Sequence, residues 1–283
     1  MNRRYIAILW LLIGVSVANA QSLAPWKNIL SFRPAKAVQK AVQSRGPTWT
    51  VHRMKDAAGR VNLDYYPVIV KKLPMLDGKQ LTPVQLLEHV RLHMNSFVDT
   101  GISDFHPFQD QDKPVWESDD PDGALVLINI KLAPGVVDYG LVVTSQDVSS
   151  EWRFSTVRGG SGFTAINDRN KPGAHPVTGN RAFGFHGAGP WTFYTIGGDR
   201  ATRSMDEFFG IPRANEIGYG QADKLWKSFQ KKLVEFVNSH EGEAEINVSA
   251  TSSKRYSWDS IKGNRTVFDT SDQPAWAPVP APN

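Results

Sequence analysis

The segment that most constrains the fold is residues 221–237, where apolar residues recur at the spacing of one helix face. These apolar positions are Ala222, Leu225, Trp226, Phe229, Leu233, Phe236 and Val237. The opposite face is charged and carries Lys224, Lys227, Lys231 and Glu235. An amphipathic helix of this kind must bury its apolar face against another layer of structure. The rest of the chain therefore has to supply a large apolar surface.

A second amphipathic helix is predicted over residues 82–98. Thr82 is placed to cap the first turn, Pro83 suits the first helical position, and Gln85 completes a capping box. The apolar residues that follow fall on one face, at Leu87, Val90, Met94, Phe97 and Val98. We therefore expect two long amphipathic helices. A shorter helix is expected over residues 35–43.

The remaining regular segments are typical of strands joined by short turns. They cover residues 48–54, 61–70, 124–131, 139–145, 151–158, 181–186, 191–196 and 244–251. Short turns imply antiparallel pairing, and a turn at 56–59 would pair the first two strands. The predicted class is α+β, with a mainly antiparallel sheet packed by the two helices. One version is a curved sheet that holds the 221–237 helix, as in helix-grip ligand-binding folds.

The first twenty residues are typical of a secretory signal peptide. Arg3 and Arg4 precede an apolar run over residues 6–18, and Ala18-Asn19-Ala20 forms a cleavage site. The run is shorter than the ~20 residues that span a bilayer. We expect a periplasmic or secreted protein with no transmembrane segment after signal removal. The mature chain is then one globular domain over 21–268 and a disordered, Pro-rich tail over 269–283.

The amino-acid composition of the chain excludes several classes of function. The chain contains no cysteine, which excludes thiolate nucleophiles and thiolate metal sites. The leader contains two of the 32 Lys and Arg residues and none of the 28 Asp and Glu residues, so the mature chain is nearly neutral. Because no basic block appears, nucleic acid is not an expected partner. The expected partner is instead a small molecule, or a protein of the cell envelope or the extracellular space. No cofactor is expected, because no cofactor-binding motif is present.

Polar residues of functional type gather between positions 175 and 203, where glycine is also frequent. They are His175, Asn180, Arg181, His186, Asp199, Arg200 and Arg203. The two strands at 181–186 and 191–196 flank a predicted four-residue loop, Gly187 to Pro190. If His186 pairs with Trp191, then Arg181 shares a face with Tyr194, and Gly184 lies across from Phe193.

Three functions fit this cluster. In the first, Asn180, Arg181, Tyr194, Arg200 and Arg203 bind a small, partly apolar anion, because guanidinium groups recognise carboxylate and phosphate. In the second, a secreted hydrolase or transferase uses His175 or His186 as a base that Asp199 orients. In the third, the protein is a secreted effector or an envelope interaction protein. A purely structural alternative has Asp199 paired with Arg181 or Arg200.

Two other groupings are candidates for a metal site. His89 and His93 are four residues apart and would lie on one face of the second helix, as metal ligands do. The acidic segment 104–122 has carboxylates but not the spacing of a calcium loop. Neither grouping has a full ligand set, so no metal site is predicted.

Overall fold

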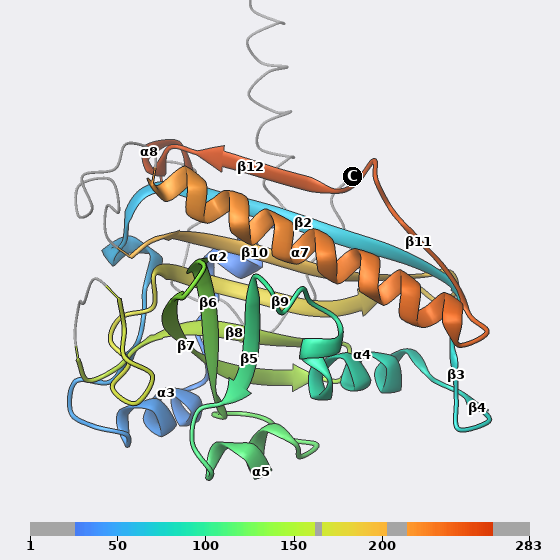
Figure 1. Cartoon of the computed structure of the whole chain (residues 1–283), viewed down its shortest axis with the longest axis horizontal. Helices are drawn as coiled ribbons and strands as arrows, with labels where there is room; N and C mark the ends of the chain where they lie inside the picture. The colour runs from blue at the N-terminus through green and yellow to red at the C-terminus, as the bar shows by residue number, and fades with distance from the viewer. Residues whose placement is uncertain (1–25, 162–165, 203–213, 263–283) are drawn as a thin grey trace, which may run out of the picture.

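The computed structural model describes residues 26–161, 166–202 and 214–262 (Figure 1). The candidate leader, the predicted tail and Arg203 lie outside these residues. Within them the chain is α+β, with a large antiparallel sheet and a few helices. The predicted fold class is confirmed at this level. None of the helices in the described ranges combines the length and apolarity that crossing a bilayer requires.

Ten strands of the described residues form one sheet in the order β11-β2-β10-β9-β8-β7-β6-β5, with β1 beside β8 and β12 beside β2. Their bounds are β1 Thr50–Val51, β2 Ala58–Lys72, β5 Ser103–Pro107, β6 Leu125–Ala133, β7 Val136–Val148, β8 Glu151–Arg158, β9 Val177–His186, β10 Trp191–Ala201, β11 Glu243–Ile246 and β12 Ser252–Tyr256. Each pair in this sheet is antiparallel. A separate small hairpin contains β3 Met75–Leu76 and β4 Lys79–Gln80.

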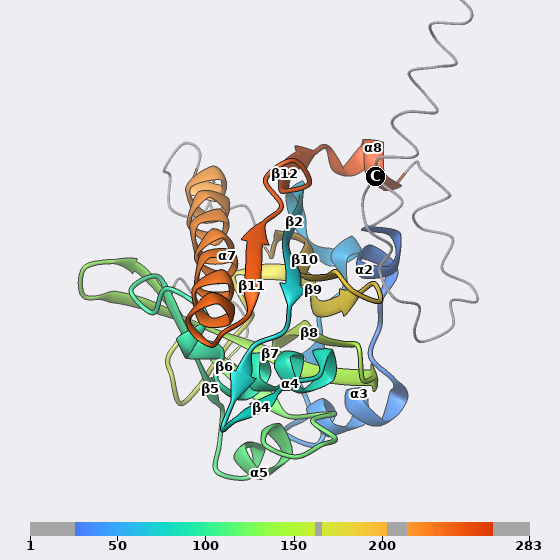
Figure 2. The same ribbon diagram turned by 90° about the vertical axis from the view of Figure 1, so that its right-hand side faces the viewer.

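Helices cover both faces of the sheet. The helical segments are α2 Lys27–Ser31, α3 Lys36–Gln43, α4 Pro83–Leu92, α5 Asp112–Trp116, α7 Ala214–Ser239 and α8 Trp258–Lys262, with 3-10 turns η2 Met54–Asp56 and η3 Met94–Ser96. α7 runs alongside β2 and β11 and in front of β10, and α4 lies on the same side of the sheet (Figures 1 and 2). α2, α3 and α8 pack on the opposite face.

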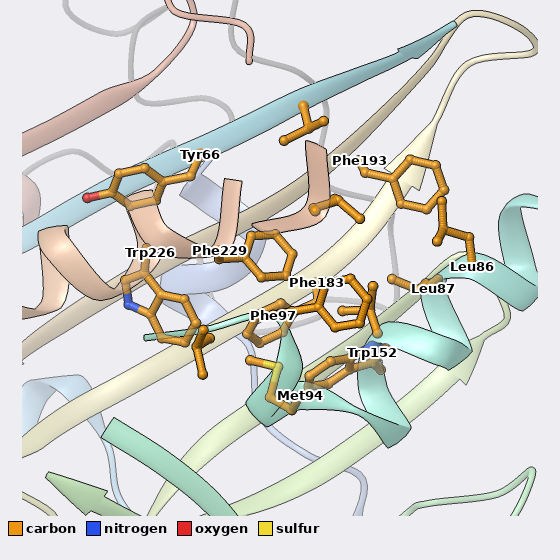
Figure 3. Packing of buried hydrophobic residues seen from close by; sticks show 14 of the residues in the cluster. Tyr66, Leu86, Leu87, Met94, Phe97, Trp152, Phe183, Phe193, Trp226 and Phe229 are labelled. Atoms are coloured by element: carbon orange, nitrogen blue, oxygen red, sulfur yellow. The ribbon is translucent and has the colours of Figure 1, made fainter. Parts of the chain in front are cut away.

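The main core lies between α7, α4 and the sheet, as the sequence pattern of residues 221–237 predicts. Trp226 and Phe229 of α7 project onto Phe183 of β9, with ring centroids 5.5 and 5.7 Å away (Figure 3). Trp152 of β8 stacks on the other side of the Phe183 ring at 4.2 Å. Such aromatic contacts add to the stabilisation from burial itself. The apolar face of α7 therefore fixes the helix across the middle of the sheet.

The second predicted helix is shorter than expected, so only α7 among the described helices is long. The capping box at Thr82 and Gln85 is present, but α4 ends at Leu92 and continues as the 3-10 turn η3. Asn95 explains the early end, because its side chain forms two hydrogen bonds with the backbone of Phe105 in β5. An α-helix that continued through Asn95 would lose this connection between α4 and the sheet.

Two predicted strand pairings are wrong. β1 pairs with β8 rather than with β2, because η2 intervenes where a tight turn was expected. The hairpin of β9 and β10 pairs His186 with Thr192, and Gly184 faces Tyr194 instead of Phe193. Five residues, Gly187 to Trp191, lie between the paired residues His186 and Thr192, one more than predicted, and Gly187 and Gly189 have positive φ. A shift of one residue moves every side chain of one strand to the other face.

The corrected register decides which residues can share a site. Arg181 and Phe183 lie on the α7 side of the sheet with Thr195, Gly197 and Asp199. Tyr194 and Ile196 lie on the opposite side, in a second core with residues of α2 and α8.

The burial of Trp226 gives a direct test of this packing. Trp226 is only 6% exposed and contacts Phe183 and Phe105. We expect Trp226→Ala to lower the free energy of unfolding by about 3–5 kcal/mol, because it removes a large buried side chain. Urea denaturation measures the change. Lys227→Ala on the exposed side of α7 is the control and is expected to change stability little. Equal midpoints for the two variants would show that the apolar face of α7 does not pack on the sheet.

Candidate functional site

A cavity of about 380 Å³ lies between α7 and strands β5 to β10. Each of these elements contributes residues to its lining. Most of the lining residues are apolar. The apolar residues are Ile102, Phe105, Ile128, Ile130, Leu132, Val142, Phe154, Pro176, Val177, Ala201, Ala222, Leu225 and Trp226. The polar residues include His175, Arg181 and Asp199 of the predicted cluster. A mainly apolar hollow with a few converging polar groups is the usual composition of a small-molecule site.

The guanidinium of Arg181 lies in the wall of this cavity and is held on both sides. Its Nη2 donates to Asp64 Oδ2 at 2.7 Å, and Nη1 donates to Thr195 Oγ1 at 3.2 Å. Its Cζ lies 4.2 Å from the centroid of the Trp226 ring, a cation–π contact. Arg181 is on β9 and Asp64 is on β2, with β10 between them. The side chain therefore crosses a whole strand to reach its partner.

Gly197 makes this crossing possible. It pairs with both Arg181 and Asp64, so it lies directly between them on β10. A Cβ atom on Gly197 would be 2.3 Å from Arg181 Nη2 and 2.9 Å from Asp64 Oδ1. Those distances are far shorter than van der Waals contact. The ion pair consequently depends on the absence of a side chain at this position.

Asn62 and Asp199 lie next to the Arg181–Asp64 ion pair, two residues along β2 and β10. They face each other on β2 and β10, and the Asn62 amide nitrogen lies 3.1 Å from Asp64 Oδ2 and 3.2 Å from Asp199 Oδ2. Asn62 and Asp64 are fully buried, whereas Asp199 is partly exposed and lines the cavity. We call Asn62, Asp64, Arg181 and Asp199 the polar cluster.

The electrostatics of the polar cluster favour an uncharged Asp199. Burial, and after it the nearby Asp64 carboxylate, raise the pKa of Asp199 to about 7, although Arg181, the Asn62 hydrogen bond and Arg255 act in the opposite direction. Asp64 differs from Asp199 because it is bonded directly to the guanidinium. Asp199 is therefore about half protonated near pH 7 and mostly protonated below it.

His175 forms another polar part of the cavity wall. Its ring occupies the space that a side chain on Gly140 of β7 would fill, since a Cβ there would be 2.5 Å from Nε2. Nδ1 is within hydrogen-bond distance of the backbone of Val177, and Nε2 is buried without a hydrogen-bond partner among the described residues. Burial is the main cause that lowers the pKa of His175 to about 3, and His52 adds to it. The imidazole is therefore neutral.

α7 is connected to the sheet edge by a second polar group. Asp223 of α7 accepts hydrogen bonds from Tyr66 Oη at 2.9 Å, Ser253 Oγ at 2.7 Å and Arg255 Nη2 at 2.9 Å. The Arg255 guanidinium also lies over the ring of Tyr219, one of the cavity-lining residues of α7. These contacts hold the N-terminal half of α7 over the cavity.

The structure separates the predicted site residues into two groups. The side chains of His175, Arg181 and Asp199 face the cavity. Asn180 contributes to the cavity wall, but its amide donates to the carbonyls of Ile29 and Phe32 on the opposite side of the sheet. Tyr194 and Arg200 also point to that side.

The partners of the second group show why these residues do not join the cavity. Tyr194 donates to Glu151 at 2.6 Å, and Arg200 donates to the carbonyls of Met54 and Gly59. His186 lies 5.8 Å from the Tyr194 ring. The predicted grouping of Tyr194 with Arg181 depended on the incorrect hairpin register.

Sequence reasoning missed Asn62 and Asp64. Both lie in a segment predicted as a strand, where they alternate with Val61, Leu63 and Tyr65. Two polar residues at alternating positions of an otherwise apolar strand lie on one face and must be paired when buried. That pattern is the signal that would have identified them. The expected pairing of Asp199 with Arg181 or Arg200 is also wrong, because Arg181 forms its ion pair with Asp64.

The groupings considered for a metal form other contacts. The rings of His89 and His93 stack at 4.2 Å, and Phe236 stacks on His89 at 4.9 Å. In the acidic segment, Asp104 bonds to His106, Asn129 and Lys131. Over the residues that the structure describes, no three or more His, Cys, Asp or Glu side chains form a group that could hold a metal ion.

No known protein-family model matches the chain, and no curated protein sequence matches it. Among solved structures, the chain is similar to the di-domain ARO/CYC StfQ from the steffimycin biosynthetic pathway. The TM-score is 0.38 and the sequence identity 7%, over 66% of this chain and 52% of StfQ. The chain thus matches about half the length of that structure, and a likeness this weak does not indicate a function.

Gly197 provides a test of the ion pair. We expect Gly197→Ala to lower the free energy of unfolding by about 3 kcal/mol, because the new Cβ displaces Arg181 from the buried Asp64. Gly220→Ala in α7 is a matched control, since nothing lies within 4 Å of a Cβ there. It should be neutral or stabilising by about 0.5–1 kcal/mol. Chemical denaturation compares the two, and equal stabilities would contradict the crossing geometry.

The pKa of Asp199 predicts a pH dependence of stability. Because the folded state retains its proton up to about pH 7 and the unfolded state up to about pH 4, the wild-type protein loses stability as the pH rises through that interval. Asp199→Asn removes this loss and keeps an acceptor for Asn62. We expect the variant to be more stable by about 1–3 kcal/mol above pH 7 and similar near pH 4.

Denaturation curves of the two proteins across this pH range measure the difference. His52 and His175, whose pKa values are lowered to about 4 and about 3, destabilise both proteins equally in acid and cancel in the comparison. A difference that stays constant with pH would show that Asp199 is ionised in the folded protein.

Proposed function

We propose that this protein binds an apolar small molecule in the cavity between α7 and strands β5 to β10, with the polar group of that molecule facing Asp199 and Arg181. The observation that carries the proposal is the cavity itself, about 380 Å³ of mainly apolar lining with Arg181 and Asp199 of the polar cluster in its wall. A curved sheet that holds a long helix over a ligand space is the helix-grip arrangement considered from the sequence. The proposal does not depend on that comparison.

The charges of the polar cluster favour an uncharged ligand over the anion expected from the sequence. One guanidinium faces two carboxyl groups, and its charge is already matched by Asp64. Lys131 also lines the cavity, but its ammonium bonds to Asp104 and to the carbonyl of Thr100. An anionic group near Asp199 would thus meet a carboxyl without an available cation in the described part of the wall. Burying an unpaired charge is costly.

Binding is favoured over hydrolysis or group transfer. The second hypothesis requires Asp199 to orient a histidine, whereas His175 Nδ1 bonds to the backbone of Val177 and His186 lies on the other side of the sheet. We also propose, from residues 1–20, that the protein acts in the periplasm or after secretion. Fractionation of the native host, with the protein followed by antibody, tests that location.

The cavity can be blocked from α7 to test binding. Ala222 lines the cavity, whereas Lys224 is exposed on the same helix. The probe is N-phenyl-1-naphthylamine, an uncharged dye that fluoresces in apolar surroundings. We expect the wild type and Lys224→Phe to bind it alike. Ala222→Phe should weaken binding by roughly tenfold or more, because the ring fills the space that the probe needs.

Fluorescence titration gives the affinities, and thermal melting checks that the variants are folded. Equal binding by a folded Ala222→Phe variant would place the probe outside the cavity. No binding by the wild type would count against an apolar ligand site.

A further inference from the structure

Asp199 has an unusual set of contacts for a carboxyl group in a cavity wall. Its only hydrogen bond to the described residues comes from the Asn62 amide, at Oδ2. No ion pair between described residues includes it. The nearest guanidinium, that of Arg181, bonds to Asp64 and Thr195 instead. Oδ1 of Asp199 is left for a group inside the cavity.

Two carboxyl groups and one guanidinium cannot balance their charges without a proton. The carboxyls of Asp64 and Asp199 converge on one Asn62 amide nitrogen, within 3.1 and 3.2 Å of it. In such a desolvated pair, ionisation of the second carboxyl is disfavoured. Of the two carboxyls, Asp64 is the one that the Arg181 guanidinium contacts directly. The proton therefore resides on Asp199.

The other charged groups near Asp199 do not change this balance. Arg255 of β12 acts on Asp199 from the sheet edge, but it pairs with Asp223 of α7. On α7, the Tyr219 hydroxyl donates to the carbonyl of Arg60 and accepts from the amide of Ala201, and Gln221, which also lines the cavity, is uncharged. No element packed against Asp199 brings an unpaired cation to it among the described residues.

We propose that Asp199 acts as a protonated carboxylic acid that donates a hydrogen bond into the cavity, and that the cavity selects uncharged apolar molecules bearing a carbonyl oxygen. This inference rests on the proposed function and names the ligand class of the same site. A carbonyl oxygen accepts the acid proton, whereas a carboxylate ligand would place a second charge beside the polar cluster. Ionisation of Asp199 removes the donor, so affinity for carbonyl ligands falls as the pH rises through neutrality.

Three probes with the same naphthalene ring separate the possible ligand classes. They are 2-acetylnaphthalene, which has a ketone oxygen, 2-ethylnaphthalene, which lacks it, and 2-naphthoate, which is an anion. Equilibrium dialysis against wild-type protein, Asp199→Asn and the exposed-site control Asp120→Asn gives each affinity at about pH 5.5 and about pH 8.5, on either side of the Asp199 transition. Circular dichroism checks that each variant is folded.

For the wild type and Asp120→Asn we expect the ketone to bind about threefold to tenfold tighter than the hydrocarbon at the lower pH, the ratio that one neutral hydrogen bond gives. The preference should disappear at the higher pH, while the affinity for the hydrocarbon stays constant. Asp199→Asn should keep the preference at both pH values, because its amide donates without titrating.

Equal affinities for ketone and hydrocarbon at the lower pH would overturn the inference, and so would tighter binding of the naphthoate. A pH-dependent preference that survives in Asp199→Asn would assign the proton to another group. Binding of the hydrocarbon reports on the cavity alone. Failure of all three probes to bind would refute the proposed function and this inference together, whereas hydrocarbon binding without a ketone preference refutes only the inference.

Discussion

The ion pair between Arg181 and Asp64 is the interaction on which the rest of the site depends. It joins β9 to β2 across β10, and it places a guanidinium flat between the sheet and the Trp226 ring of α7. The ion pair therefore connects the strands of the sheet to one another and also contacts the helix that packs on them. Because Asp64 is fully buried, removal of the guanidinium would leave a carboxylate with no counter-charge in its direct contacts. The pair therefore holds the cavity wall in one arrangement.

The cavity itself results from missing side chains as much as from those present. Gly197 leaves a path for Arg181, and Gly140 leaves a recess that the His175 ring fills. Between these positions the strands carry Val142, Phe154 and Val177, which are apolar and do not reach far enough to close the space. α7 spans the gap because its Trp226 and Phe229 rings pack near Phe183 while the smaller Ala222 lies over the hollow. The size of the side chains along α7 thus determines where the core ends and the cavity begins.

Much of the fold could be predicted from the sequence, because periodicity reports burial directly. The stripe from Ala222 to Val237 and the capping box at Thr82 specified two helices, and the alternation along residues 151–158 specified β8. The site was harder because it depends on register and on pairing between distant strands. Arg181 could be selected as a candidate, but its partner Asp64 is 117 positions away and β2 pairs with β10 only in the folded sheet. One additional residue in the Gly187–Trp191 loop was enough to move Tyr194 to the other side.

The polar cluster also shows how burial and function are connected in this protein. A strand with Asn62 and Asp64 at alternating positions would destabilise an apolar sheet unless each side chain found a partner. Arg181 offsets the charge of Asp64, and Asn62 bonds to both carboxyls, but among the described residues Asp199 receives that one hydrogen bond alone. An apolar residue at position 199 would avoid the remaining cost. Buried polar groups that lack hydrogen-bond partners in a folded protein lower its stability, and they occur most often at functional sites. The incomplete satisfaction of Asp199, at the surface of an apolar hollow, is therefore the observation on which the proposed ligand contact rests.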